Sequence, residues 1–198
     1  METTEHITEA YVRHVLGWFT NSNIKAKGGK EIGILAIDVR ENKYHIESGV
    51  THKKNWALKS KRSKEDFDLE KGKTKWKHRN SVDFFIKEKF NDKRVIEKLI
   101  DFDFNDNYKK IIVVWQVANN EVFEYGKSKG VEVWELKDKV KNLMNSLGET
   151  YYSDDILRTL QLVNKVNEER KKGFLSFLKQ KIYDKNFMRI VKEGLKEV

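Results

Sequence analysis

The sequence predicts an α/β protein in which a mixed β-sheet is flanked by helices and followed by a helical C-terminal extension. Three observations indicate this class. Glu31–Lys53 contains two runs of β-branched and aromatic residues around the polar turn "RENK", which is typical of a β-hairpin. Lys110–Val117 is a nearly continuous apolar run, as found in strands covered on both faces. A helix pattern and another strand pattern follow it, which indicates a β-α-β crossover.

The first segment predicts an amphipathic helix from about Glu5 to Thr20. Thr3 or Thr4 can cap this helix, and apolar residues recur at helical spacing as far as Trp18. The triplet "NSN" then ends the helix, and "KGGKE" supplies a glycine turn that leads into the hairpin.

The middle of the chain changes from regular patterns to dense charge. Residues 53–80 predict a short helix followed by a long basic loop, and we call this stretch the basic excursion. Order returns at Ser81, a candidate N-cap for the helix "VDFFIKEKF", and "DKRVIEKLIDF" predicts a second helix.

The last part of the chain predicts helix and strand in turn. A helix ends near Gly130, the strand "VEVWEL" follows, and "KDKVKNLMNSLG" predicts a helix that ends at Gly148. The remainder predicts two helices, one on either side of Gly173. We therefore expect an α/β domain over residues 1–148 and a helical extension over residues 149–198.

Composition excludes several classes of protein. Aromatic residues make up 12% of the 198 residues, more than a disordered chain carries. No segment approaches the roughly 18 apolar residues of a membrane span, and the start "METTEHITEA" lacks the pattern of a signal peptide. The absence of cysteine excludes disulfides and thiolate metal sites, and it suits an intracellular, cytoplasmic protein with no membrane partner.

The formal net charge of +9 favours a polyanionic partner, nucleic acid first. The basic excursion combines this charge with tryptophans, a combination that binds phosphates and stacks on bases. A solvated loop anchored by its tryptophans is the structural alternative. The candidate nucleic-acid-binding residues are Lys54, Trp56, Lys59, Lys61, Arg62, Lys73, Lys75, Trp76, Lys77 and Arg79.

Three stretches of the chain follow one another in an informative order: "GGKEIGILAID", "KYHIES" and "IIVVWQVANNEVFEYGKSKGVEVWELKDKVKNLM". Their order and spacing resemble the PD-(D/E)xK nuclease superfamily, especially its archaeal Holliday-junction-resolvase-like and Mrr-like members. The resemblance covers about Glu5 to Leu147. It implies a restriction-endonuclease-like fold, Mg²⁺-dependent hydrolysis of duplex DNA, and a homodimer, because relatives that act on two strands often dimerise.

The resemblance also implies a set of catalytic and metal-binding residues. The helix acid corresponds to Glu9 and the strand glutamate to Glu47, which would bind Mg²⁺ together with a strand aspartate. Gly33 occupies the position of that aspartate, and Gly49 occupies the position of the lysine that activates water. Glycine has no side chain, so the pattern is half complete. The candidates for replacing the missing groups are Glu31 and Asp38 as metal ligands, Lys53 as the lysine, and the nearby His45 and His52.

The register of the hairpin bears on these candidates. If Glu41–Asn42 forms a tight turn, Asp38 lies opposite His45 and shares a face with Glu47. A slip of one residue places Gly33 on that face instead. The sequence leaves both registers open.

Each candidate also has a structural explanation. Glu9 on an amphipathic helix can simply be solvated, and Glu47 can be the partner of a Lys or His in a buried pair. Structural positions are also expected for His45 and His52, which lack the spacing of zinc ligands, and for Trp115 and Trp134 as core aromatics. Gln116 resembles the polar residue that some family members place beside the active site, and a hydrogen-bonded core amide is the alternative.

Three functions follow from these observations. The first, which the sequence favours, is a DNA-binding protein of nuclease-like fold whose hydrolytic activity is lost or weak. The second is an active Mg²⁺-dependent endonuclease that uses Glu9, Glu47, Lys53 and a displaced acid, either Asp38 or Glu31. The third is a protein-interaction module that dimerises through its C-terminal helices.

Overall fold

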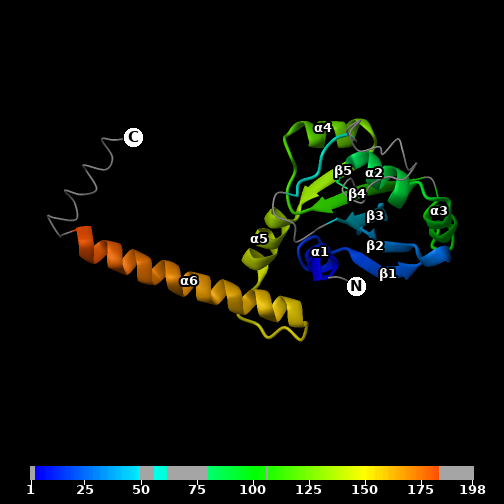
Figure 1. Ribbon diagram of the computed structural model, residues 1–198. Helices are drawn as coiled ribbons and strands as arrows, with labels where there is room; N and C mark the ends of the chain where they lie inside the picture. Colours follow the sequence, from blue (N-terminus) through cyan, green and yellow to red (C-terminus); the bar gives the residue numbers. More distant parts are fainter. Residues whose placement is uncertain (1–2, 50–55, 62–79, 106, 183–198) are drawn as a thin grey trace. The chain divides into compact units, whose positions relative to one another are not determined.

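Figure 1 shows the computed structural model of the chain, which describes residues 3–49, 56–61, 80–105 and 107–182. The chain divides into two compact units, Met1–Ser146 and Leu147–Val198. The first unit contains the sheet and the helices that cover it. The second contains one long helix, α6 (Asp155–Ile182).

The first unit is built on a five-stranded mixed sheet. Its strands, in spatial order, are β1 (Phe19–Lys25), β2 (Glu31–Ile37), β3 (Lys43–Ser48), β4 (Tyr108–Val114) and β5 (Val131–Glu135). β2 is antiparallel to both β1 and β3, whereas β4 is parallel to both β3 and β5. The predicted α/β class with a mixed sheet is confirmed.

Helices cover both faces of this sheet (Figure 1). The described helical elements of the first unit are α1 (Thr3–His14), η1 (Lys27–Gly29), α2 (Val82–Phe85), the π-helical turn η4 (Ile86–Phe90), α3 (Lys93–Ile100), α4 (Glu121–Ser128) and α5 (Leu136–Ser146). On one face α1 packs against α5, and Tyr11 of α1 makes an edge-to-face contact with Trp134 of β5, with 5.9 Å between ring centroids. On the other face Ile112 of β4 joins a core cluster with Phe85 of α2 and Val122 of α4.

The first helix is shorter than predicted, and a strand follows it. α1 ends at His14, and Gly17 adopts a left-handed φ of +71° before the chain enters β1. β1 reads "FTNSNIK" and lies at the edge of the sheet, where it pairs with β2 alone. An edge strand buries few side chains, so its polar sequence does not predict a strand.

The start of the basic excursion is extended in its described part. The N–H of Leu58 donates to the carbonyl oxygen of Gln116 at 3.0 Å, and the N–H of Ala118 donates to the carbonyl oxygen of Leu58 at 2.8 Å. The predicted short helix is therefore wrong for these residues. Their backbone groups pair with the chain that leaves β4 and not with one another.

Two predicted helix boundaries have different outcomes. Ser81 caps α2 as predicted, because its hydroxyl oxygen accepts a hydrogen bond from the N–H of Phe84 at 3.2 Å. α6 continues through Gly173, where the sequence predicts a break. A glycine inside a helix costs about 1 kcal/mol relative to alanine, which is too little to end a long helix.

The register of the β2–β3 hairpin separates Asp38 from Glu47. The N–H of Asp38 donates to the carbonyl oxygen of Asn42 at 3.1 Å, and the hydroxyl of Tyr44 donates to Oδ2 of Asp38 at 3.0 Å. Side chains alternate between the faces of a strand, so Asp38 and Tyr44 lie on the face opposite to Glu47. The register that places Asp38 opposite His45 is wrong, and the glycine of β2 approaches Glu47 instead.

Gly49 follows β3 at a point of close packing. Its N–H donates to the carbonyl oxygen of Val113 at 2.8 Å, which extends the pairing of β3 with β4. A Cβ atom at this position would overlap the ring of Phe85, which is 2% exposed in the core. Packing therefore explains this glycine without reference to a missing lysine.

We predict that Gly49→Ala lowers the free energy of unfolding by about 1–3 kcal/mol, because the added methyl group overpacks the core. Urea denaturation measures this change. The double variant Gly49→Ala/Phe85→Leu should lose less than the sum of the two single variants, since the smaller side chain makes room. Strictly additive losses would contradict the contact between Gly49 and Phe85.

Candidate functional site

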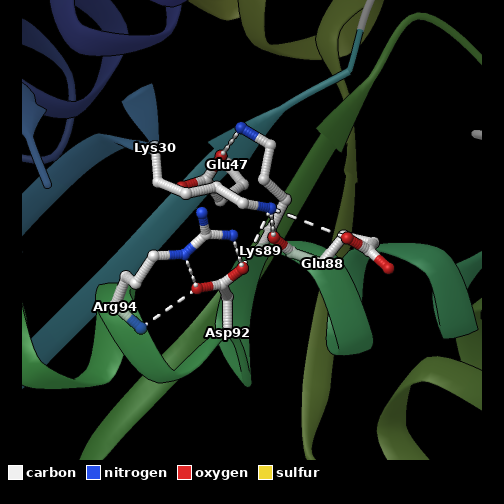
Figure 2. Close-up of polar contacts among 6 residues, drawn as sticks. All are labelled: Lys30, Glu47, Glu88, Lys89, Asp92 and Arg94. Carbon is white, nitrogen blue, oxygen red and sulfur yellow. Dashed lines mark hydrogen bonds and ion pairs between the residues drawn. The ribbon is translucent and has the colours of Figure 1, made fainter. Parts of the chain in front are cut away.

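The carboxylate of Glu47 lies buried near the end of β3, with cationic or N–H groups at both of its oxygens. The side chain is 0% exposed. Oε1 accepts from the N–H of Gly33 at 3.1 Å and lies 2.9 Å from Nε2 of His45. Oε2 lies 2.9 Å from Nζ of Lys89 (Figure 2). Burial of a carboxylate is costly unless it is paired and hydrogen-bonded. Here Oε1 accepts the hydrogen bonds, and Oε2 forms the ion pair with Lys89.

Gly33 allows β2 to approach this carboxylate closely. A Cβ atom on Gly33 would lie 2.8 Å from the carbonyl oxygen of Ile46, which is closer than packing permits. The same Cβ would lie 3.7 Å from Oε1 of Glu5, a residue of α1. Two acids on different elements, Glu5 and Glu47, therefore flank Gly33, whereas the resemblance implies Glu9 as the helix acid.

Lys89 reaches Glu47 from the π-helical turn η4. The N–H of Asn91 donates to the carbonyl oxygen of Ile86 at 2.8 Å, and this five-residue spacing defines the wide turn. Such turns are rare and occur often at functional sites. The side chain of Lys89 is 33% exposed, so it contacts solvent as well as the buried carboxylate of Glu47.

A second group of charges holds η4 against the glycine turn η1. Nζ of Lys30 lies 3.0 Å from Oδ2 of Asp92 and donates to the carbonyl oxygen of Glu88 at 3.0 Å. Arg94 donates to both carboxylate oxygens of Asp92, at 2.9 and 2.7 Å, and holds the pKa of Asp92 well below its ordinary value. The residues drawn in Figure 2 are three acids and three bases. This balance stabilises the turn that presents Lys89.

His45 supports Glu47 from two residues earlier on the same face of β3. Its ring is 0% exposed and makes an edge-to-face contact with Phe90, with 4.8 Å between ring centroids. A carboxylate only accepts hydrogen bonds, so Nε2 carries the proton in the bond to Glu47. Nδ1 has no hydrogen-bond partner among the residues that the structure describes.

The electrostatics of Glu47 favour the ionised form. Burial raises the pKa of Glu47, but the hydrogen bond and charge of His45 and the ammonium of Lys89 lower it by more. The pKa of Glu47 therefore lies below its ordinary value, and the carboxylate is negative at neutral pH.

Two of the predicted metal ligands make structural contacts elsewhere. Glu9 accepts hydrogen bonds from the hydroxyls of Thr20 at 2.7 Å and Ser22 at 3.0 Å, which fasten α1 to the edge strand β1. Glu31 forms an ion pair with Lys25 across β1 and β2 at 2.8 Å. The structure does not bring either carboxylate into the contacts of the buried glutamate.

Asp38, the third predicted ligand, organises the β2–β3 turn. Its Oδ1 accepts from the N–H of Arg40 at 2.8 Å and from the N–H of Asn42 at 2.9 Å. Partial burial raises the pKa of Asp38, but these bonds and those of the Asn42 and Tyr44 side chains lower it to about 2. Asp38 is thus a turn residue on the opposite face from Glu47.

The predicted nucleic-acid-binding residues are only partly within the described chain. Trp56, Lys59 and Lys61 are described, and Nζ of Lys61 lies 5.6 Å from the ring centroid of Tyr125. The predicted residues outside the described chain are His52, Lys53, Lys54, Arg62, Lys73, Lys75, Trp76, Lys77 and Arg79.

The two tryptophans predicted as core aromatics differ. Trp134 is 8% exposed, as predicted, but Trp115 is 47% exposed because it follows the last residue of β4. The amide of Gln116 donates to the carbonyl oxygen of Trp56 at 3.2 Å, so it joins the start of the basic excursion to the end of β4.

The residues around Glu47 do not fit the Mg²⁺ ion that the resemblance implies. Mg²⁺ requires near-octahedral oxygen ligands, commonly one or two carboxylates with waters and phosphate. Among the described residues no group of three or more His, Asp or Glu side chains could hold a metal ion. The ammonium of Lys89 lies against Oε2 of Glu47, where a cation bound to this carboxylate would lie.

Sequence reasoning missed Lys89 and Glu5. A buried Glu47 predicts a cationic partner, but the chain contains 40 Lys and Arg residues, and nothing in the sequence distinguishes Lys89 from the others. Glu5 was passed over because it and Glu9 lie one turn apart on the same helix pattern.

Comparison with known proteins gives no match to a family model, a curated protein or a solved structure. Within the described part of the chain, no helix has the length and apolar character needed to cross a membrane.

We predict that Lys89→Met lowers the free energy of unfolding by about 1–3 kcal/mol, because it leaves the buried carboxylate of Glu47 without its ammonium partner. The loss is smaller than for a fully buried pair, since a third of the Lys89 side chain is exposed. Lys93→Met is the matched control: Lys93 is 90% exposed and should change stability by less than about 0.5 kcal/mol. Equal effects in chemical denaturation would contradict the role of Lys89.

Acid unfolding provides a second prediction. The pKa of Glu47 is lower in the folded than in the unfolded chain, so its contribution is fully present above the ordinary carboxyl pKa of about 4.3 and is lost as the pH falls through the folded value. Glu47→Gln should therefore show a smaller loss of stability below about pH 5 than the wild type. Asp38 is present in both proteins, so its contribution to the pH dependence of stability cancels in the comparison. If the wild type and Glu47→Gln lose the same free energy of unfolding as the pH falls, the lowered pKa of Glu47 is contradicted.

Proposed function

We propose that this protein binds nucleic acid, DNA in particular, through the basic excursion. In this proposal the fold is nuclease-like, and the ammonium of Lys89 stands in the place of a catalytic cation, so that hydrolysis is weak or absent. The observation that carries the proposal is the concentration of positive charge in a segment whose two ends meet at the edge of the sheet that carries Glu47.

The distribution of charge supports this proposal. The basic excursion contains eleven Lys and Arg residues against four Asp and Glu residues, a surplus of seven in a chain whose net charge is +9. Affinity for DNA grows with the number of cations that contact phosphates. Trp76 adds an aromatic face on which a base can stack, whereas Trp56 packs against the core cluster of Phe85 and Ile112 and anchors the excursion.

The described residues of the excursion, 56–61 and 80, are joined to each other and to the end of β4. The N–H of Lys59 donates to the carbonyl oxygen of Asn80 at 2.7 Å, and Lys59 forms a parallel bridge with Ser81. Leu58 forms the same kind of bridge with Val117. The excursion thus leaves and rejoins the fold at the carboxyl end of β4.

The same edge carries the Glu47–Lys89 pair and an exposed aromatic ring. Glu47 pairs in register with Ile112 of β4, and Trp115 follows three residues later, 47% exposed. A duplex held by the excursion would therefore meet a further stacking surface and the exposed part of Lys89.

The contacts of Glu47 support binding over hydrolysis. A general base or metal ligand must direct a lone pair towards the substrate or the metal. The oxygens of Glu47 instead face Gly33, His45 and Lys89.

Salt-dependent binding of a short fluorescent duplex, followed by anisotropy, tests the proposal. We expect replacement of Lys71, Lys73, Lys75 and Lys77 by Gln to reduce the slope of log K against log salt by up to about 3–4, since each phosphate contact contributes about 0.9. Four exposed lysines outside the excursion provide a matched control with the same change in charge: Lys87, Lys93, Lys137 and Lys141. Equal loss of slope in the two variants, or no binding of the wild type at low salt, would contradict the proposal.

Incubation with Mg²⁺ or Mn²⁺ tests the catalytic part separately. We expect little or no product from duplex, flap or junction DNA. Cleavage by the wild type that disappears in Glu47→Gln would overturn this part and would support an active endonuclease. This result would leave the binding part of the proposal untouched, because that part is tested by the slope of log K against log salt.

Dimerisation through the C-terminal helices stays a prediction with one supporting observation. Leu162, Val163 and Val166 of α6 are between 46% and 58% exposed. Sedimentation of the wild type and of Val163→Glu tests whether this apolar stripe joins two copies.

A further inference from the structure

A cavity of about 690 Å³ lies at the amino end of β4, the end opposite to the basic excursion. Its volume is in the range of small-molecule sites, about 300–1,000 Å³. Tyr108 lines it together with Ile96 and Ile100 of α3, which are 43% and 57% exposed, whereas Phe104 in the same lining is only 4% exposed. Exposed apolar side chains in a concave site can be covered by a ligand.

Lys110 is a half-buried cation in this cavity. Its Nζ donates to Oδ1 of Asn91 at 3.3 Å and lies 5.6 Å from the ring centroid of Tyr108. Burial lowers the pKa of Lys110, and no carboxylate among the described residues opposes this effect. An ammonium that has lost water without gaining an anion is unfavourable, and a bound anion would offset that cost.

Other lysines line this cavity and the one beside it. Lys129 lines the same cavity. The lining of an adjoining cavity of about 660 Å³ shares Tyr108, Lys110 and Gly130 with the first and adds Lys109, Phe123, Lys127, Val131, Glu132 and Val133.

The acid in this lining does not neutralise the lysines. Glu132 accepts a hydrogen bond from the indole N–H of Trp134 at 2.6 Å, and it forms no ion pair with a lysine of the cavity in the described part of the chain. The cavity is therefore positive at the place where its two parts meet.

The lining suits a nucleotide better than other anions. The partly exposed ring of Tyr108 offers a surface for a base, and the amides of Asn91 and Asn105 offer hydrogen-bonding groups for its edge. A fatty acid would need no such amides. Inorganic phosphate alone would leave Ile96 and Ile100 exposed.

We propose that this cavity binds a nucleoside phosphate, with the phosphate at Lys110 and Lys129 and the base against Tyr108 and Ile100. Either a free nucleotide or the phosphorylated end of a nucleic acid supplies this chemistry. The proposal uses neither the basic excursion nor Glu47, so it stands or falls separately from duplex binding.

Isothermal titration of the full chain with the four ribonucleoside monophosphates tests the proposal. We expect at least one to bind with a Kd below about 1 mM. Lys110→Met should weaken that binding at least tenfold, and Lys110→Arg should retain most of it. Loss of a half-buried lysine without an anionic partner should not lower the unfolding temperature, which separates lost binding from lost folding. Lys141→Met, on the exposed side of α5, is the control that should bind as the wild type does.

Three results would overturn the proposal: no binding of any monophosphate, equal binding by Lys110→Met, or tighter binding of laurate than of the nucleotides. A further comparison distinguishes the two sources. If a 5′-phosphorylated single strand binds Lys110→Met more weakly than wild type while its 5′-hydroxyl counterpart does not, the end of a nucleic acid is the ligand. If both strands bind the variant and the wild type alike, while the monophosphate still binds Lys110→Met more weakly than the wild type, the ligand is a free nucleotide.

Discussion

The ion pair between Glu47 and Lys89 joins the two segments that border the basic excursion, the end of β3 and the π-helical turn η4. A carboxylate that is 0% exposed must be compensated locally, and the geometry around it follows from that need. The N–H of Gly33 donates to Oε1, and a side chain there would overlap the backbone at Ile46. His45 donates to the same oxygen from β3. The wide turn η4 brings the ammonium, and it is held in place by the charges around Asp92 (Figure 2).

Patterns that depend on burial were predictable from the sequence, and long-range pairings were not. The apolar run of β4, the crossover to β5 and the cap at Ser81 follow from local composition, because a strand covered on both faces must be apolar and a helix start needs an acceptor. β1 escaped prediction because an edge strand can be polar. Glu47 was predictable as a buried acid. Lys89 was not, because its role depends on where β3 and η4 meet.

The glycines show how a family resemblance and packing give different accounts of the same residue. In the resemblance, Gly33 and Gly49 mark a missing aspartate and a missing lysine. In the structure each is a point of close approach: a side chain at Gly33 would meet the backbone at Ile46, and one at Gly49 would overlap Phe85. A catalytic side chain could return to either position only with movement of its neighbours.

The central claim is that Lys89, and not a metal ion, neutralises the charge of Glu47. The side-chain carboxyl ¹³C resonance of Glu47, followed during titration with Mg²⁺, tests this claim directly. We expect the resonance of the wild type to stay unchanged as Mg²⁺ is added, and to shift when Lys89 is replaced by Met. A saturable shift of the wild-type resonance with Mg²⁺ would contradict the account and would place a cation at Glu47.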